Sequence, residues 1–273
     1  GVKKIFTETG AGQWGSSLAF AGQMFGIDIE VFMVKVSFDQ KPYRKLMMQS
    51  FGATCHPSPS EITDFGKKLL SEDSNNPGSL GIAISEAIEA VVKSEGKAKY
   101  ALGSVLGHVL MHQTINGNEA ILQMEQAGDY PDIIVGCTGG GSNLAGLMFP
   151  FLGQQLRGGQ KIDIIGCEPL SCPSFTKGKY AYDHGDMARM TPLIKMHTLG
   201  SDFLPPANHS GGLRYHGMSY HLSHLYDLGL MRAKAYGQKD CFEAGVIFGK
   251  QEGIIPAPEG NHAVKGAIDV ALE

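Results

Sequence analysis

Two glycine-rich stretches contain the residue types and spacings in this sequence that could do chemistry. Glu8 stands directly before residues 9–15, which read TGAGQWG, and residues 139–143 read GGGSN. Glycine loops of this kind turn several backbone N–H groups toward one point, which suits an anionic ligand. The sequence therefore predicts two anion-binding loops, one of them with a carboxylic acid beside it.

The second loop, residues 139–143, lies between an apolar strand-like run and a helix-like segment. Its consecutive amides and the positive end of the helix would form a cradle that most often holds a phosphate. It lacks the lysine of a P-loop, and Leu144 stands where a dinucleotide fingerprint needs its third glycine. We expect a phosphate site here, with a plain tight turn as the alternative. Glu168 ends a later strand on the ligand side of the sheet, so we expect it to line a site as well.

The first loop matches the G-x-G-x-x-G spacing of a dinucleotide site, with Asp39 as the candidate ribose ligand. Glu8 argues against this interpretation, because a carboxylate there would repel a pyrophosphate. Trp14 is also bulky where the helix should begin. A loop that holds a small carboxylate through its amides, with Glu8 transferring a proton, uses all of these residues. We favour that second interpretation.

The elements that position these loops follow from short β-branched runs that alternate with longer helical patterns along the 273 residues. The alternation predicts an α/β fold of two Rossmann-like, three-layer domains with mainly parallel sheets. Residues 1–112 would form the N-terminal domain, with the carboxylate loop and a mobile region, and residues 113–273 the C-terminal domain with the phosphate loop. Strands are expected at 2–6, 28–36, 53–58, 132–137 and 161–169, and helices at 16–26, 41–52, 80–94, 112–128, 144–156, 238–253 and 261–273. Residues 172–225 are expected to be irregular.

Composition narrows the class of protein. The net charge of -4 and the 18% of charged residues are typical of a globular enzyme and do not favour nucleic-acid binding. Five cysteines without a C-x-x-C spacing indicate free thiols in a reducing cytosol, and we expect no metal site. No apolar run is long enough to span a bilayer, and we expect no signal peptide. A cytoplasmic protein without nucleic-acid or membrane partners is expected.

Ten stretches of the chain together resemble the tryptophan synthase β chain, and the resemblance runs from end to end. Trp14 and the run GGLRYHG (211–217) are closer to the second, often stand-alone type of that family than to the type that works with an α subunit. The ten stretches are ETGAGQWG (8–15), KPYRKLMMQSFGA (41–53), HPSPSE (56–61), PGSLGIAISEAIE (77–89), LGSVLGHVL (102–110), GCTGGGSN (136–143), SCPSFTKGKYAYD (171–183), TPLIKMHTLG (191–200), HSGGLRYHGMS (209–219) and EGIIPAPEGNHA (252–263).

The resemblance implies a pyridoxal-phosphate enzyme of fold type II, in which the cofactor lies between two α/β domains. The family joins L-serine to indole by β-replacement, which gives L-tryptophan. A homodimer is expected for the full-length protein. A monovalent cation is compatible with the resemblance, and whether an α subunit binds stays open.

The resemblance also assigns roles to residues, motif by motif. Glu8 becomes the acid–base that helps hydroxide leave and takes the proton from indole. The amino-acid carboxylate would be held by Thr9, Gly10, Ala11, Gly12, Gln13 and Trp14. The cofactor phosphate would be held by Gly139, Gly140, Gly141, Ser142 and Asn143.

Two positions depart from the family pattern. The family usually has a serine after the glutamate of EGNHA, which bonds the pyridine nitrogen. Gly260 stands there in this chain, so Asn261 or a water is expected to take over that contact. Arg214 stands where the α-partnered type has an aspartate that holds the serine hydroxyl. A cation there would favour the anionic leaving group of O-phosphoserine, and a structural ion pair is the alternative.

The family's Schiff-base lysine belongs to a Ser-His-Lys motif that would lie before Gly1, and a further family segment would follow the last helix. We therefore expect an interior piece of the family chain, truncated at both ends and impaired in activity. We also expect exposed apolar surface that promotes self-association. A non-catalytic remnant that binds phosphate-bearing ligands is one alternative function. A nicotinamide-dependent dehydrogenase is the other.

Overall fold

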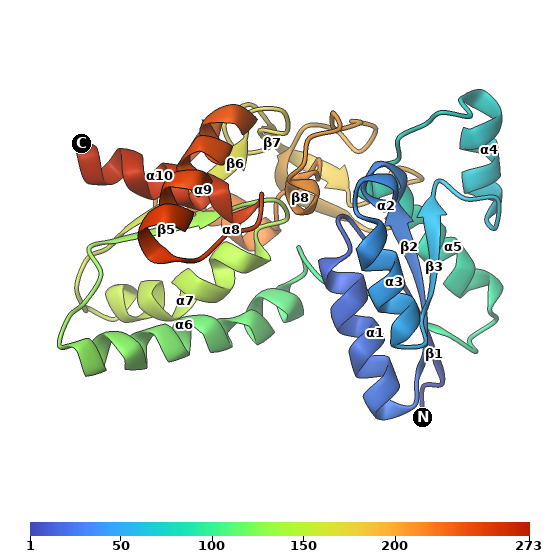
Figure 1. Ribbon diagram of the computed structural model, residues 1–273, viewed down its shortest axis with the longest axis horizontal. Coiled ribbons are helices and arrows are strands. Elements are labelled where there is room, and N and C mark those ends of the chain that lie inside the picture. Colours follow the sequence, from blue (N-terminus) through green and yellow to red (C-terminus); the bar gives the residue numbers. More distant parts are fainter. The chain divides into compact units, whose positions relative to one another are not determined.

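The chain is organised around two separate parallel sheets (Figure 1). The computed structural model describes residues 1–273, which divide into two units. Unit 1 consists of residues 1–103, 182–194 and 200–216, and unit 2 consists of residues 104–181, 195–199 and 217–273. Residue 112, the expected domain boundary, lies inside helix α6 (Gly107–Ala127).

Unit 1 contains a four-stranded sheet in the order β3-β2-β1-β4, with every pair parallel. The central strand β2 is buried on both faces, because side chains alternate across a strand. Val31 and Met33 pack with α1 and α3, whereas Phe32 packs with α5 on the other face. The elements are β1 (Lys4–Thr9), α1 (Gln13–Phe25), β2 (Asp28–Val34), α2 (Lys35–Gln40), α3 (Pro42–Ser50), β3 (Thr54–Ser58), α4 (Asp64–Glu72), α5 (Leu80–Lys93), β4 (Lys99–Ala101) and the 3-10 turn η1 (Gly211–Leu213).

Unit 2 contains a three-stranded parallel sheet in the order β5-β6-β9. Ile134 and Ile164 join the core beneath α6, α7 and α8, whereas α10 packs on the opposite face at Val135 and Cys167. The elements are α6, β5 (Ile133–Cys137), α7 (Ser142–Leu156), β6 (Asp163–Pro169), α8 (Tyr220–Asp227), β9 (Arg232–Tyr236), α9 (Gln238–Glu252) and α10 (Gly260–Leu272). A separate two-stranded sheet is formed by β7 (Lys179–His184) and β8 (Leu193–Thr198).

The expected α/β fold with mainly parallel sheets is confirmed. The expectation of an irregular stretch at 172–225 was wrong, since β7, β8, η1 and most of α8 lie within it. The sequence also showed no sign of α4, of β4 or of β9, and the last two strands are short and begin with a charged residue. All five cysteines are free, as expected, and all five are buried. None of the helices is both long enough and apolar enough to cross a membrane.

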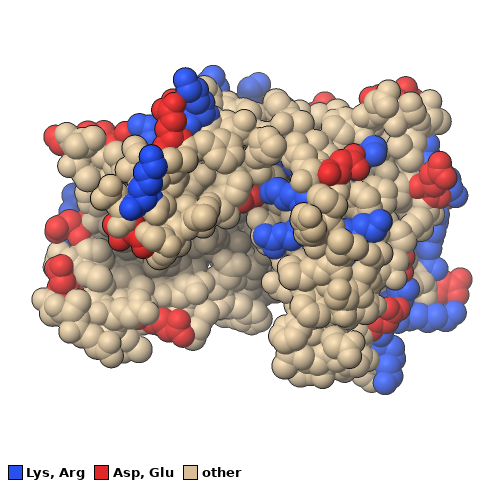
Figure 2. Space-filling view, viewed as in Figure 1, with Lys and Arg blue, Asp and Glu red and all other residues tan.

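Helices α1 and α3 carry large apolar side chains on their outer faces, and few charges appear over them in Figure 2. The two helices contact each other, and Phe20 of α1 lies 5.2 Å from Phe51 between ring centroids. The exposed apolar residues are Phe20, Met24, Phe25, Tyr43, Leu46 and Met47.

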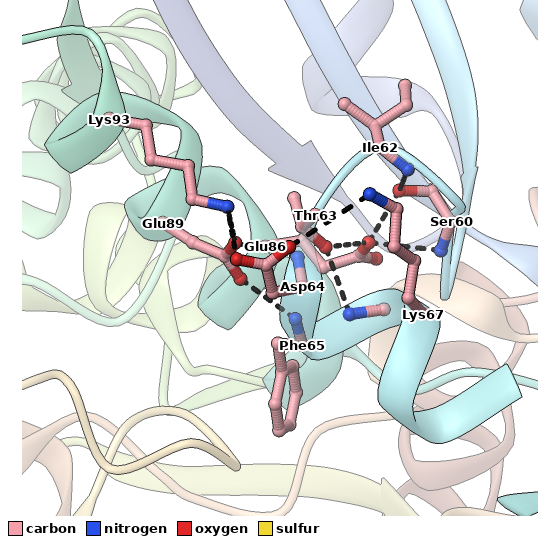
Figure 3. A network of polar contacts seen from close by, with 10 residues as sticks. Ser60, Ile62, Thr63, Asp64, Phe65, Lys67, Glu86, Glu89 and Lys93 are labelled. Carbon is pink, nitrogen blue, oxygen red and sulfur yellow. Dashed lines mark hydrogen bonds and ion pairs between the residues drawn. The ribbon is translucent and has the colours of Figure 1, made fainter. Parts of the chain in front are cut away.

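The loop after β3 is fastened to α5 by Glu86, a fully buried carboxyl (Figure 3). Glu86 accepts hydrogen bonds from the Ser60 amide at 3.0 Å and from the hydroxyls of Ser60 and Thr63 at 2.6 Å each. The hydroxyl of Ser58, the last residue of β3, donates to its other oxygen. Because the strands are parallel, Ser58 and the end of β1 lie at the same edge of the sheet. Glu86 therefore fixes one loop of that edge.

One turn further along α5, Glu89 holds the beginning of α4. Its two oxygens accept from the amides of Asp64 at 2.7 Å and Phe65 at 3.0 Å, which belong to the first turn of α4. Such amides lack partners within their own helix, and a carboxylate suits the positive helix end. Lys93 completes the network with ion pairs to Glu89 at 2.6 Å and Asp64 at 2.7 Å (Figure 3).

Glu86→Gln is expected to loosen this loop, because the new NH2 group would face hydroxyl and amide donors. A buried donor that loses its acceptor costs about 1–3 kcal/mol, and several donors surround Glu86. Hydrogen exchange of the amides of residues 60–66 should therefore speed up by at least about tenfold. Lys93→Met removes ion pairs of a half-exposed lysine and leaves every Glu86 contact in place, so it should change this exchange much less. Equal protection in Glu86→Gln and the parent would contradict this role.

Candidate functional site

Glu8 lies near the carboxyl end of β1, the edge where open α/β sheets bind ligands. Its side chain is only 3% exposed, and the Tyr100 hydroxyl donates to Oε2 at 2.5 Å. Burial raises the pKa of Glu8 to about 8, although the hydrogen bond from Tyr100 acts in the opposite direction. At neutral pH this carboxyl is therefore mostly protonated, and it can both give and take a proton.

The loop after Glu8 is tied together by Thr9. The Thr9 hydroxyl oxygen accepts from the amides of Gly12 and Gly15, each at 3.2 Å. Gly12 has a φ of 94° and is the N-cap of α1, a conformation that favours glycine. The remaining first-turn amides of α1, beginning with Gln13, have no partner within the helix and point toward its positive end. The loop can thus present amides to a small carboxylate.

Gly10 and Ala11 pack against the turn η1. A Cβ built on Gly10 would lie 3.0 Å from the Gly211 oxygen, and one built on Gly211 would lie 3.0 Å from the Ala11 Cβ and 2.8 Å from Nη2 of Arg214. Arg214 is 5% exposed, and its Nη2 donates to the Ser37 hydroxyl. The structure therefore brings Arg214 to the carboxylate loop.

The side chain of Trp14 is bonded and packed within unit 1. Its indole Nε1 donates to the Thr7 hydroxyl oxygen at 2.8 Å. Its ring covers Gly103, where a built Cβ would collide with Cδ2 of Trp14. The indole is therefore fixed against the segment after β4, and the part of Trp14 that can serve a carboxylate is its backbone amide.

The second predicted loop joins β5 to α7 in unit 2. Gly139, Gly140 and Gly141 are buried, and Gly141, with a φ of 94°, is the N-cap of α7. No side chain caps this helix, so its first-turn amides are left for another acceptor. Ser142 is the first residue of α7, and Asn143 turns its amide back to the Cys137 oxygen at 3.4 Å.

The glycines of this loop are needed because its neighbours are close. A Cβ on Gly140 would lie 2.6 Å from Val105 Cγ2, and one on Gly141 would lie 2.5 Å from Leu222 Cδ1. The Ser219 amide also donates to the Gly140 oxygen at 3.0 Å. Backbone held this closely at an uncapped helix start fits a phosphate group, which needs amides rather than side chains.

Gly260 and Asn261 begin α10. A Cβ on Gly260 would meet only Pro256, at 3.8 Å, so the position has room for the side chain that glycine lacks. Asn261 is 4% exposed, and its Oδ1 has no hydrogen-bond partner. Its amide lies against Gly245 of α9, where a built Cβ would collide with Oδ1. Asn261 is thus placed in the seam between α9 and α10.

Glu168, expected to line a site, is held by the protein instead. It is fully buried, and it accepts from the amides of Phe175 and Thr176 at 2.8 Å each and from the Thr176 hydroxyl at 2.6 Å. These contacts give it a structural role in the turn after β6.

Sequence reasoning missed Tyr100 and Ser37. Tyr100 is 92 positions from Glu8, on a strand of three residues, and Ser37 is 177 positions from Arg214. Neither residue belongs to a motif, so only the fold reveals these pairs. Glu8, residues 9–14 and Arg214 belong to unit 1, whereas residues 139–143, 260 and 261 belong to unit 2.

Comparison with known proteins places these loops in a family. The family profile described as "Pyridoxal-phosphate dependent enzyme" matches residues 2–273. A Thermotoga maritima protein named "Tryptophan synthase beta chain 2" is 58% identical over 268 residues, which cover 98% of this chain and 63% of that protein. An Aeropyrum pernix protein of the same name is 56% identical over 273 residues, which cover 100% of this chain and 61% of that protein.

A solved structure agrees with the fold. The crystal structure of a threonine deaminase from the organism abbreviated T.th. matches with a TM-score of 0.69 at 15% identity, over 99% of this chain and 73% of that chain. The chain spans 61–63% of the length of the two curated relatives above. It belongs to the family of pyridoxal-phosphate-dependent enzymes, and its resemblance to the second type of tryptophan synthase β chain is confirmed along its whole length.

Proposed function

We propose that the protein carrying this chain makes L-tryptophan from indole and L-serine by a pyridoxal-phosphate-dependent β-replacement. The observation that carries the proposal is the buried Glu8 carboxyl, with a pKa of about 8, directly beside a loop of backbone amides. The names of relatives at 56–58% identity support the same reaction. The homodimer stays a prediction, and whether an α subunit binds stays open.

The cofactor phosphate would be held by the amides of residues 139–143 at the start of α7. When bound, pyridoxal phosphate withdraws electrons from the α-carbon of an amino acid, which allows the group on its β-carbon to leave. Gly260 supplies no side chain toward the pyridine nitrogen, and Asn261 is engaged in the helix seam. We therefore assign the cofactor mainly to the phosphate loop.

The amides of residues 10–14 would orient the amino-acid carboxylate. Glu8 would hold one proton on its carboxyl and deliver it to the departing hydroxyl oxygen, which leaves as water. The resulting carboxylate would then accept the proton that the indole ring loses when the new bond forms, so Glu8 returns to its starting state. A carboxyl with a pKa near neutrality suits both transfers.

We propose O-phosphoserine as a second amino-acid donor. Its phosphate leaves as an anion, and Arg214 is a buried cation beside the carboxylate loop. An anionic leaving group gains more from a nearby cation than a hydroxyl does. The bond from Arg214 to Ser37 supports the alternative as well, in which the arginine only anchors η1 to α2.

Glu8→Gln should lower kcat for tryptophan formation by about 10²–10⁴, since the amide cannot transfer the proton. Binding of pyridoxal phosphate, followed by absorbance, should be unchanged. Glu61→Gln, an exposed carboxyl in the loop after β3, is the control and should keep full activity. The assay uses the gene product that contains residues 1–273. Full activity of Glu8→Gln would refute the proposed role, whereas cofactor binding without tryptophan from either donor in the parent would favour the non-catalytic remnant.

Gly141→Ala should weaken the binding of pyridoxal phosphate and of inorganic phosphate by at least about tenfold, because the methyl group collides with Leu222 and shifts the amides. Gly158→Ala is a matched control, since Gly158 also has a positive φ (93°) but nothing within 4 Å of the added carbon. Both variants carry similar backbone strain. Equilibrium titration with each ligand therefore shows whether affinity falls because of strain alone or because the amides of residues 139–143 have moved. Equal affinities in the two variants would contradict the phosphate assignment.

Arg214→Met should lower kcat/KM for O-phosphoserine by at least about tenfold relative to L-serine, because the cation is lost while the apolar stem remains. Arg214→Lys retains the charge and should preserve more of the preference. Both donors are compared in the same preparations, so a general loss of folding lowers both rates together. A strong preference of the parent for L-serine would argue against this donor.

A further inference from the structure

We propose that Tyr100 is the positioning residue for the acid–base carboxyl: its hydroxyl holds Oε2 of Glu8, so that the transferred proton is carried on Oε1. The inference rests on the proposed function of Glu8 and adds a residue that the motifs do not contain. The contact is a hydrogen bond of 2.5 Å between two side chains that belong to neighbouring strands of one sheet.

The register of the sheet explains how this contact arises. Tyr100 is the middle residue of β4 and pairs with Phe6 of β1. Residues two apart on a strand share a face, so Phe6 and Glu8 lie on the same face of the sheet as Tyr100. The long phenol side chain therefore reaches one step along β1, to the carboxyl of Glu8.

A chain of hydrogen bonds on the opposite face holds β4 in place. Thr7 lies between Phe6 and Glu8 and donates from its hydroxyl to the Ala101 oxygen at 2.5 Å. The same hydroxyl accepts from the indole of Trp14 at 2.8 Å. Trp14 belongs to the carboxylate loop. These hydrogen bonds and the intervening backbone connect the loop, β4 and Tyr100 to Glu8 in a closed ring of contacts (the circuit). The circuit couples the placement of the substrate loop to the placement of the acid.

The hydroxyl of Tyr100 remains a donor over the useful pH range. Burial and the adjacent Glu8 carboxylate raise the pKa of Tyr100 well above its ordinary value. A donor of this kind stabilises the ionised carboxylate and so opposes the effect of burial on Glu8. The other ionisable groups that act on this pair are Tyr215 and Asp186, and Tyr215 directs its hydroxyl to the Gly185 oxygen instead.

Tyr100 therefore does two things that a buried carboxyl needs. It occupies one oxygen, which leaves the other to carry the proton toward the ligand. It also keeps the ionised form accessible, so that Glu8 can act as a base after it has acted as an acid. A carboxyl without this partner would rotate and would hold its proton more tightly.

Tyr100→Phe tests the inference through the titration of Glu8 itself. Carbon-13 NMR of the glutamate-labelled gene product gives the midpoint, and the signal that disappears in Glu8→Gln identifies Glu8. Loss of a hydrogen bond to a charged group should raise the midpoint by about one to two pH units. The pH profile of kcat should move by the same amount, while KM for the amino-acid donor changes little because residues 9–14 are not altered.

Tyr215→Phe is the matched control, because it removes a buried tyrosine hydroxyl of unit 1 that does not bond Glu8. If Tyr100→Phe is poorly folded by circular dichroism, 3-fluorotyrosine introduced at position 100 keeps the shape and strengthens the donor, which should lower the midpoint. An unchanged midpoint with a folded variant, or an equal shift in Tyr215→Phe, would overturn the inference. Full activity of Glu8→Gln would instead overturn the proposed function. The effect of Tyr100→Phe on the titration midpoint of Glu8 does not depend on that outcome.

Discussion

The chemistry proposed for unit 1 depends on the removal of one carboxyl, that of Glu8, from water. Burial raises the pKa of a carboxyl, and a hydrogen-bond donor beside it lowers the pKa again. Glu8 is only 3% exposed, and Tyr100 supplies the donor. The three-residue strand β4 is short, yet it places this donor. The importance of β4 lies in the hydroxyl of Tyr100 rather than in its contribution to the core.

Helix α5 is the common support of the segments around that edge. Three of its polar residues contact segments outside the helix. Glu86 and Glu89 hold the loop after β3 and the start of α4. Ser85 donates to Asp186 at 2.8 Å, and Asp186 in turn accepts from the Thr191 amide at 2.9 Å. A single rigid helix thereby arranges loops that the order of the chain would leave independent.

The sequence was informative where local backbone geometry demands particular residues. Gly12 and Gly141 each require a positive φ at the start of a helix, so the two loops could be predicted from glycine spacing alone. Ser79, a residue type that favours the start of a helix, caps α5, since its hydroxyl oxygen accepts from the Ile82 amide at 3.2 Å. These features depend on neighbours within a few positions.

Long-range pairs could not be predicted in this way. Tyr100 meets Glu8 only because β4 joins β1 in parallel, and the sequence of β4 shows no pattern from which that pairing follows. The same is true of Ser37 and Arg214. Asn261 has its amide against Gly245 of α9, a placement that depends on the fold, and its expected contact with the cofactor stays a prediction.

Trp14 is the single tryptophan of the chain, and it lies inside the circuit that joins the substrate loop to β4. Its indole is bonded to Thr7 and packed over Gly103, so the polarity around the ring depends on whether that circuit is closed. Indole emission from this chain therefore has one source, at the loop itself. The wavelength and quenching of its emission can therefore follow the loop without any added label.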